Sequence, residues 1–186
     1  MFAKPPPIPE LVYQRVMLVG KIDGYLILMS AGMLALFFAP SGFYVFTIAS
    51  CLAAGTGAME VHGARLLSRG DEGGVNWLVR AQLLLMFVVV AFVLYYANRF
   101  DTEFFNSLIP EIRAQAAETY PRFGLDDPYA KISDSELLMV MRVSINLMLV
   151  MLGVVSCVYQ GLMARYYHKR RAAIEQALDI LYGQDE

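Results

Sequence analysis

The residues with the greatest capacity for chemistry are ionisable side chains that interrupt long apolar segments. A charge at membrane depth is costly, so such residues are functional candidates by default. The four strongest candidates are Asp23, Glu60, Arg80 and Arg142. Asp23, Glu60 and Arg80 lie near those ends of the apolar segments that are flanked by basic residues. Arg142 lies near the opposite end of the fourth segment.

The first candidate site is a polar layer at the inner membrane interface. Its expected members are Asp23, Glu60, Arg80, Gln82 and Gln160. Glu60 and Arg80 flank the connection between two antiparallel segments and could form an ion pair. Three interpretations remain open: a structural clasp, the mouth of an ion or proton path, or long side chains that extend to the interface.

The second candidate site is a polar group that enters the fourth apolar segment from the outside. Arg142 can extend outward to water, whereas Asn146 needs a hydrogen-bonding partner within the protein. The pair is compatible with an outer polar vestibule. One Asn and one Arg do not make a selectivity filter.

Catalytic and metal-binding patterns are not visible in the sequence. Glu60 and His62 stand two residues apart, so on a helix they point to roughly opposite faces and cannot chelate one ion together. We find no Ser-His-Asp set and no metal-ligand spacing. We therefore expect a protein that is not an enzyme and that needs no cofactor or metal.

Four apolar segments must position these residues, and they cover residues 22–39, 43–61, 78–97 and 137–164. The composition is 58% hydrophobic and only 17% charged. A helix needs about 20 apolar residues to cross a bilayer, and a single span can pair all its backbone groups in lipid only as a helix. The sequence predicts an all-α membrane protein built as a four-transmembrane-helix bundle.

The distribution of basic residues predicts the orientation. In a four-crossing arrangement one side carries these basic residues: Lys4, Arg15, Lys21, Arg65, Arg69, Arg80, Arg165, Lys169, Arg170 and Arg171. The loop at residues 98–136 carries eight acidic residues against four basic ones. By the positive-inside rule both termini are cytoplasmic and the long loop is outside. The style of the sequence indicates a bacterial inner (plasma) membrane, with anionic lipids at the cytoplasmic face.

The segments outside the spans are expected to be largely helical. Residues 1–21 form a cytoplasmic arm with an interfacial helix that begins near Pro9, and Gly20 and Gly24 are possible bends. In the outer loop we expect short helices at residues 101–108 and 110–118, followed by irregular chain. The run Ser133–Glu136 fits a capping box that opens the fourth span.

The C-terminal segment, residues 165–186, is expected to be a cytoplasmic amphipathic helix. Residues 165–182 contain no proline and no glycine, so one helix could run from Leu137 to Tyr182, which is about 69 Å. Its apolar face would offer a docking surface formed by Ile174, Leu178 and Leu181. The basic residues that precede it are explained by topology and lipid contact, so we expect no nucleic-acid partner.

Small residues recur at four-residue spacing on three spans, a pattern that lets membrane helices approach closely. The recurring residues are Ala31, Ala35 and Ala39; Ser50, Ala54 and Ala58; and Gly153, Cys157 and Gly161. A short first and a long second outer loop are similar to the tetraspanin layout, but the long loop contains no cysteine, so we assign no family. We expect an accessory or scaffold subunit that acts by association with itself or with other membrane proteins. The alternative is a small homo-oligomeric channel or transporter.

Overall fold

The computed structural model describes residues 8–99, 102–124, 126 and 131–182. The described residues form six helices and no strand. The helices are α1 (Pro9–Phe38), α2 (Tyr44–Leu67), α3 (Gly73–Ala97), α4 (Thr102–Arg122), α5 (Asp134–Lys169) and α6 (Arg171–Tyr182). By length and composition, α1, α2, α3 and α5 are long and apolar enough to cross a membrane, so the chain has the character of a multi-pass membrane protein.

The chain divides into two compact units, which we describe separately. Unit 1 consists of Met1–Phe92 and Val155–Glu186, and unit 2 consists of Val93–Val154. The helices α3 and α5 therefore each contribute residues to both units.

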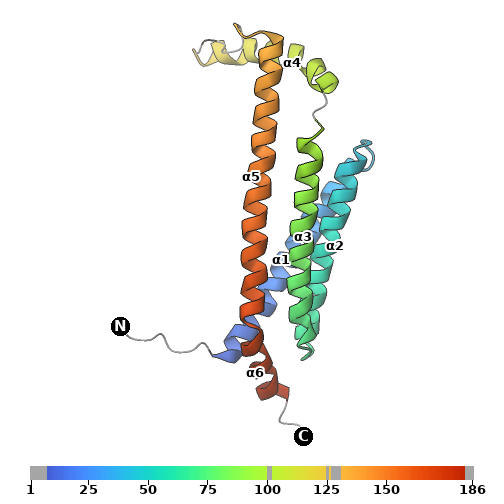
Figure 1. Ribbon diagram of the computed structural model, residues 1–186, viewed down its shortest axis with the longest axis vertical. Helices are drawn as coiled ribbons and strands as arrows, with labels where there is room; N and C mark the ends of the chain where they lie inside the picture. The colour runs from blue at the N-terminus through green and yellow to red at the C-terminus, as the bar shows by residue number, and fades with distance from the viewer. Residues whose placement is uncertain (1–7, 100–101, 125, 127–130, 183–186) are drawn as a thin grey trace, which may run out of the picture. The chain divides into compact units, whose positions relative to one another are not determined.

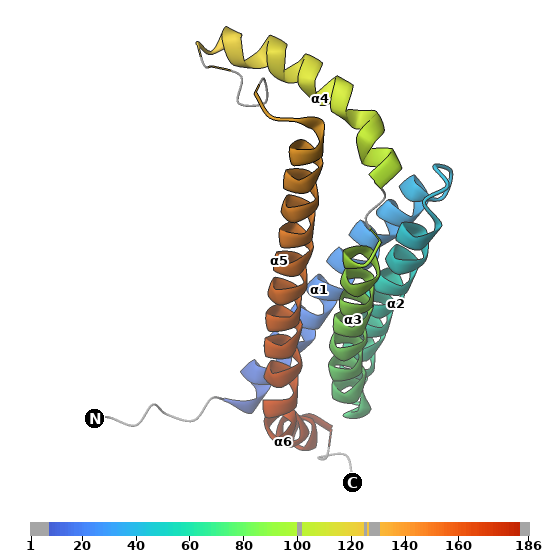
Figure 2. The same ribbon diagram turned by 45° about the horizontal axis from the view of Figure 1, so that its top comes forward.

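In unit 1, α1 and α2 run antiparallel and lie side by side (Figure 1, Figure 2). Their closest approach is at Gly57, where an added β-carbon would lie 2.5 Å from the backbone nitrogen of Leu28 and 2.7 Å from the carbonyl oxygen of Gly24. On the next helix, a β-carbon at Gly63 would lie 2.8 Å from the carbonyl oxygen of Gly74. Glycines thus allow direct backbone contact from α1 to α2 and from α2 to α3, which is how helices pack well without a hydrophobic drive in lipid.

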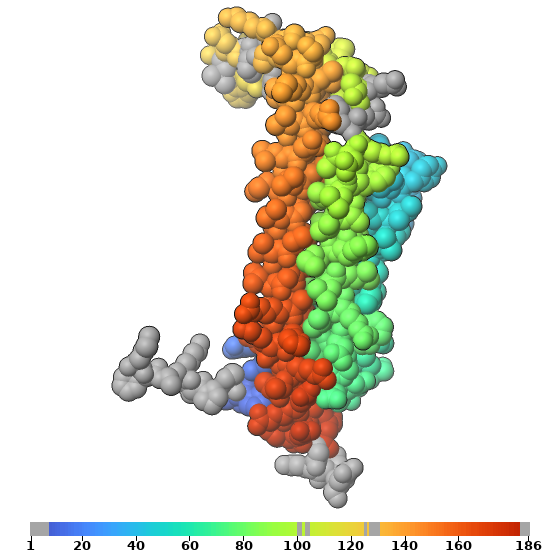
Figure 3. All heavy atoms as spheres, in the orientation of Figure 1, coloured from blue at the N-terminus to red at the C-terminus, as the bar shows by residue number. Residues whose placement is uncertain are grey.

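One end of unit 1 carries its main apolar core. The first turns of α1, the end of α2, the start of α3, the last turns of α5 and one face of α6 meet there (Figure 1). The core residues are Val12, Tyr13, Val16, Ala64, Leu67, Val75, Leu78, Tyr167, Ile174, Ala177 and Leu178. The Tyr13 hydroxyl donates to the carbonyl oxygen of Leu67 at 2.7 Å, so its polar atom is satisfied inside the core. In Figure 3 the atoms of α6, in dark red, lie against those of the start of α1, in blue.

Unit 2 contains α4 and is organised by polar contacts at the start of α5. The Ser133 hydroxyl accepts from the Glu136 backbone N–H at 3.3 Å, and the Glu136 carboxylate accepts from the Ser133 backbone N–H at 2.9 Å. This is the predicted capping box, and it is confirmed. Arg113 of α4 forms an ion pair with Asp134 at 2.7 Å and donates to the carbonyl oxygen of Ile132 at 2.6 Å.

The predicted N-terminal helix and the first span form one continuous helix, α1, from Pro9 to Phe38. Gly20 and Gly24 are used for packing; a β-carbon at Gly20 would lie 2.9 Å from the Leu78 side chain. Bends at these two glycines stay a prediction. Pro9 does occupy the first turn, as predicted.

Two expectations about the helices are wrong. First, the described residues of the outer loop form one helix, α4, which continues through Pro110 instead of forming separate short helices. Second, the long helix predicted from Leu137 to Tyr182 is interrupted at Arg170. The interruption lets α6 place Ile174 and Leu178 in the core of unit 1, where they are 0% and 7% exposed. A straight continuation of α5 would leave these side chains in water.

Candidate functional site: a buried polar network

The candidate site lies inside unit 1 and draws one or two side chains from each of four helices. Asp23 comes from α1, Glu60 from α2 and Gln82 from α3, and these three residues belong to the predicted polar layer. Tyr159 and Tyr167 come from α5. The close glycine contacts between α1, α2 and α3 bring the first three helices near enough for short polar side chains to meet.

Gln82 is the centre of the network. Its amide nitrogen Nε2 donates to Asp23 Oδ2 at 3.0 Å and to Glu60 Oε1 at 2.8 Å. The two carboxylates on either side fix the orientation of the amide, because a flipped amide would place its oxygen against two acceptors. Both hydrogens of the Gln82 amide are therefore used, and the two carboxylates are held beside one nitrogen.

The tyrosines of α5 supply the remaining donors. Tyr167 donates from its hydroxyl to Glu60 Oε1 at 2.8 Å, and Tyr159 donates to Asp23 Oδ1 at 3.1 Å. The sequence analysis missed both residues because tyrosine near the end of a span is typical of the interfacial belt. A signal for Tyr167 did exist, since it stands seven residues after Gln160 and so lies on the same helical face.

The network is closed to solvent at its centre. The exposed fractions are 1% for Glu60, 1% for Gln82 and 0% for Tyr167. The predicted pairing of Glu60 with Arg80 is wrong, because Arg80 is exposed and Glu60 bonds instead to Gln82 and Tyr167. Arg80 and Gln82 are two residues apart on one helix, so only one of them can face the bundle.

Gln160 is buried, as expected of a member of the layer, with 6% of its surface exposed. Its carbonyl oxygen Oε1 has no hydrogen-bond partner, and the same holds for Oε1 of Gln82. Unpaired buried carbonyl oxygens are uncommon in proteins and call for an explanation. Gln160 makes no hydrogen bond to the network residues, so within the network the acceptor without a donor is Gln82 Oε1.

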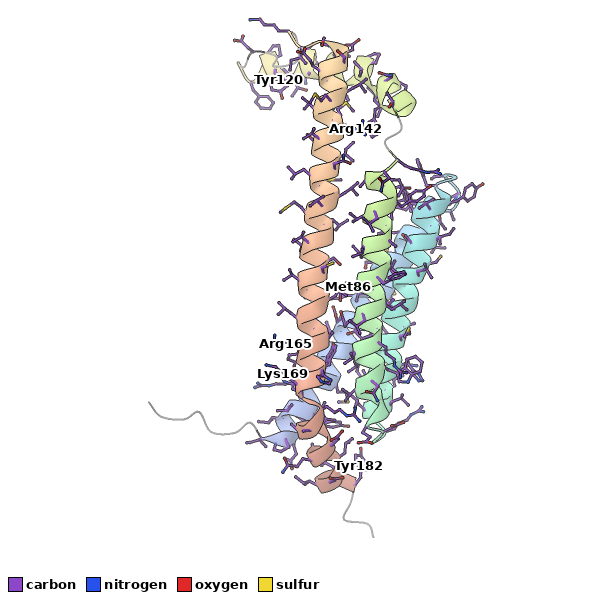
Figure 4. All side chains as sticks on the ribbon, in the orientation of Figure 1. Met86, Tyr120, Arg142, Arg165, Lys169 and Tyr182 are labelled. Atoms are coloured by element: carbon purple, nitrogen blue, oxygen red, sulfur yellow. The ribbon has the colours of Figure 1, made fainter. Side chains whose placement is uncertain are left out.

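The predicted outer vestibule belongs to unit 2. Arg142 is exposed in the first half of α5 (Figure 4), and Asn146, one helical turn further on, is half-buried. On the same face of α5, Gly153 packs against Val93, where an added β-carbon would have ordinary contacts of 3.5 Å. The vestibule itself stays a prediction.

The three candidate docking residues of α6 differ in their surroundings. Ile174 and Leu178 are covered by the core of unit 1, whereas Leu181 is 49% exposed. A partner that docks on α6 would therefore meet Leu181 and its exposed neighbours, and not the face that the sequence analysis selected.

No metal-binding arrangement is present in the part of the chain that the structure describes: no group of three or more His, Cys, Asp or Glu side chains could hold a metal ion. His62 instead makes an edge-on contact with the Trp77 ring, with centroids 5.1 Å apart. A shallow pocket of about 200 Å³ lies between the α2–α3 turn and α6, lined by Gly70, Glu72, Glu175, Leu178, Asp179 and Tyr182.

Comparisons with known proteins add no family to this description. No protein-family model matches the sequence, and no curated protein or solved structure matches it. What the protein does must be argued from its own geometry.

Proposed function

We propose that this protein is a non-catalytic integral membrane protein that acts by association, as an accessory or scaffold subunit of a membrane complex. It would reside in a bacterial inner membrane with both termini in the cytoplasm. The partners would be further copies of this chain or other membrane proteins.

The observation that carries the proposal is an exposed stripe of small residues on α2. Cys51, Gly55 and Ala58 stand at helical spacing and are all exposed, and we call them the outer α2 face. Nothing lies within 4 Å of the position that a β-carbon on Gly55 would occupy. Two residues further on, Gly57 packs directly against the backbone of α1 at Leu28 and Gly24, so small residues on this helix do support close packing.

An unused small-residue face favours a protein partner over lipid. Lipid tails are as apolar as Leu, so membrane helices gain free energy of association from close van der Waals packing. Small residues allow that packing, whereas against lipid they offer no advantage over larger apolar residues. The outer α2 face is therefore suited to a second helix.

Basic residues at one end of unit 1 support the proposed orientation. Arg165 and Lys169 extend from the last turns of α5 (Figure 4), and both are exposed. Arg69, in the turn between α2 and α3, is exposed as well. Such residues are suited to anionic headgroups of the cytoplasmic leaflet, and they agree with the positive-inside rule.

The test is native mass spectrometry of the protein extracted gently from its own membrane, comparing wild type with Gly55→Leu. We expect the wild type to be recovered as an assembly and Gly55→Leu to be recovered mainly as a monomer. Val158→Leu is the matched control, because it also places a leucine at an exposed position of a membrane helix, but on α5 and at a position that is not occupied by a small residue. A wild type that is monomeric under all gentle conditions, or a Gly55→Leu variant that assembles as well as the control, contradicts the proposal.

The second candidate is a small homo-oligomeric ion channel or transporter, and the pair formed by the buried Glu60 and the half-buried Asp23 favours it. Intramembrane carboxylates are typical of ion and proton pathways. Flux of monovalent ions or protons into liposomes that contain the purified protein tests this function, with Glu60→Gln and Asn146→Leu as variants. Wild-type liposomes without flux above protein-free liposomes would exclude it.

A further inference from the structure

The buried network has a shortage of hydrogen-bond donors. Its donors are the two amide hydrogens of Gln82 and the hydroxyl hydrogens of Tyr159 and Tyr167. All four are directed at the carboxylates of Asp23 and Glu60. The buried Gln82 Oε1 is left without a donor, although the amide that carries it lies between the two acids. One more hydrogen is needed to satisfy the network.

The same network carries an excess of negative charge. The ion pairs among the described residues are Arg113–Asp134, Arg122–Glu118 and Arg171–Glu175, and none of them includes Asp23 or Glu60. Two ionised carboxylates that face one nitrogen, without a cation, repel each other strongly at low dielectric.

The groups around the pair do not supply a positive charge. Glu60 on α2 is faced by Asp23 of α1, Gln82 of α3 and Tyr167 of α5. The basic residues nearest to the pair along these helices form no ion pair with either acid: Arg65 on α2, Arg80 on α3 and Arg165 on α5 are exposed, and Lys21 on α1 is half-buried. A hydrogen ion added at the Asp23–Glu60 pair would supply both the missing donor and the missing positive charge.

We propose that Asp23 and Glu60 hold one proton between them at neutral pH, so that the buried network is a proton-binding site. The proton bonds to one carboxylate oxygen and converts that acceptor into an O–H donor. The new O–H can donate to the facing carboxylate or to Gln82 Oε1, and the network loses one negative charge. This inference does not depend on the proposed role in association.

A proton fits the site better than a metal ion does. Three of the four carboxylate oxygens, Asp23 Oδ1, Asp23 Oδ2 and Glu60 Oε1, already accept hydrogen bonds. Glu60 Oε1 accepts two of these bonds, and no group of three or more His, Cys, Asp or Glu side chains among the described residues could hold a metal ion. A proton needs only one carboxylate oxygen and adds a donor. A buried water could donate to Gln82 Oε1, but it would leave the charge of the pair unchanged.

Infrared titration of the full-length protein in lipid nanodiscs tests the proposal, because only a protonated carboxyl group shows the C=O band of a carboxylic acid. We expect one such band in the wild type at neutral pH, shifted in deuterium oxide and lost on titration to alkaline pH. Glu60→Gln and Asp23→Asn should both lack the band. The matched control Asp179→Asn, which changes an exposed acid on α6, should retain it.

The melting temperatures of the variants are also measured, to check that the variants fold. Glu60→Gln keeps an oxygen to accept from Gln82 and Tyr167 and gains an N–H₂ donor, so it imitates the protonated site and should melt at a temperature no lower than that of the wild type. A wild type without the band at neutral pH, or a band that persists in both variants, overturns the proposal. Loss of the band when sodium replaces choline as the salt cation would identify a metal site and overturn it as well.

Discussion

Glycine and alanine occur on both faces of α2, but the two faces have opposite surroundings. The inner face carries Gly57, Glu60, Ala64 and Leu67, all buried, and it contacts α1 and the core of unit 1. The outer face carries small residues of the same kind and is exposed. The comparison shows that small residues in a membrane helix allow close packing. Whether a face is packed depends on whether another helix lies against it.

The largest difference between the two faces is expected from adding a large side chain to each. Gly57→Leu should lower the free energy of unfolding by more than about 4 kcal/mol, because the backbones of Gly24 and Leu28 occupy the space and cannot move aside. Gly55→Leu should change it by no more than about 0.5 kcal/mol. Unfolding in micelles, followed by the fluorescence of Trp77, measures both; equal effects would remove the distinction between the faces.

The next prediction concerns how much the packing of α6 against the inner face of α2 contributes to stability. Ile174 is completely buried in the core that also holds Ala64 and Leu67. Ile174→Ala should destabilise unit 1 by about 3 kcal/mol, through lost burial and the cavity that remains. Leu181→Ala, at an exposed position of the same helix, is the control and should have little effect. If the two variants melt alike, α6 does not pack as described.

A smaller effect concerns the polar part of the inner face. Tyr167→Phe removes the hydroxyl that donates to Glu60 Oε1 at 2.8 Å and should cost about 2 kcal/mol, because a buried charged acceptor loses a donor. For the outer side of the bundle, Tyr25→Phe is the control, since the exposed Tyr25 hydroxyl has only a 3.5 Å contact with Arg65. Thermal unfolding of the two variants side by side gives the comparison, and an equal or larger loss in Tyr25→Phe would contradict it.

The smallest expected effect is a stabilisation, caused by a substitution on the outer α2 face. Gly55→Ala should stabilise the isolated chain by about 0.5 kcal/mol, because Ala is the better helix former and the added methyl group meets nothing. The same variant should weaken self-association measured in native membranes if the outer α2 face is an interface. Stabilisation without any change in association would indicate that the outer α2 face contacts lipid and not a second protein.

Part of the fold and of the site followed from local sequence. The four helices were predicted because long apolar runs must pair their own backbone groups in lipid, and the capping box at Ser133 is a local pattern. Asp23, Glu60 and Gln82 were placed at one depth by counting residues. Helical rotation also separates Gln82 from Arg80, so their different burial could have been anticipated.

The break at Arg170 could not be predicted in that way. The sequence there contains neither glycine nor proline, and the helical pattern continues across it. The chain turns because Ile174 and Leu178 become buried against residues more than 100 positions away, such as Val16 and Leu67. A similar long-range contact joins Tyr167 to Glu60.

The sequence by itself determined which segments are apolar helices, and it predicted that Asp23 and Glu60 lie at one level of the bundle, because both depend on the spacing of residues along the chain. Only the tertiary structure decided that Gly57 is packed while Gly55 is open, and that Glu60 faces a glutamine and a tyrosine instead of an arginine. Those outcomes depend on how each helix is rotated and how closely its neighbours approach, and these are set by contacts between residues far apart in the chain.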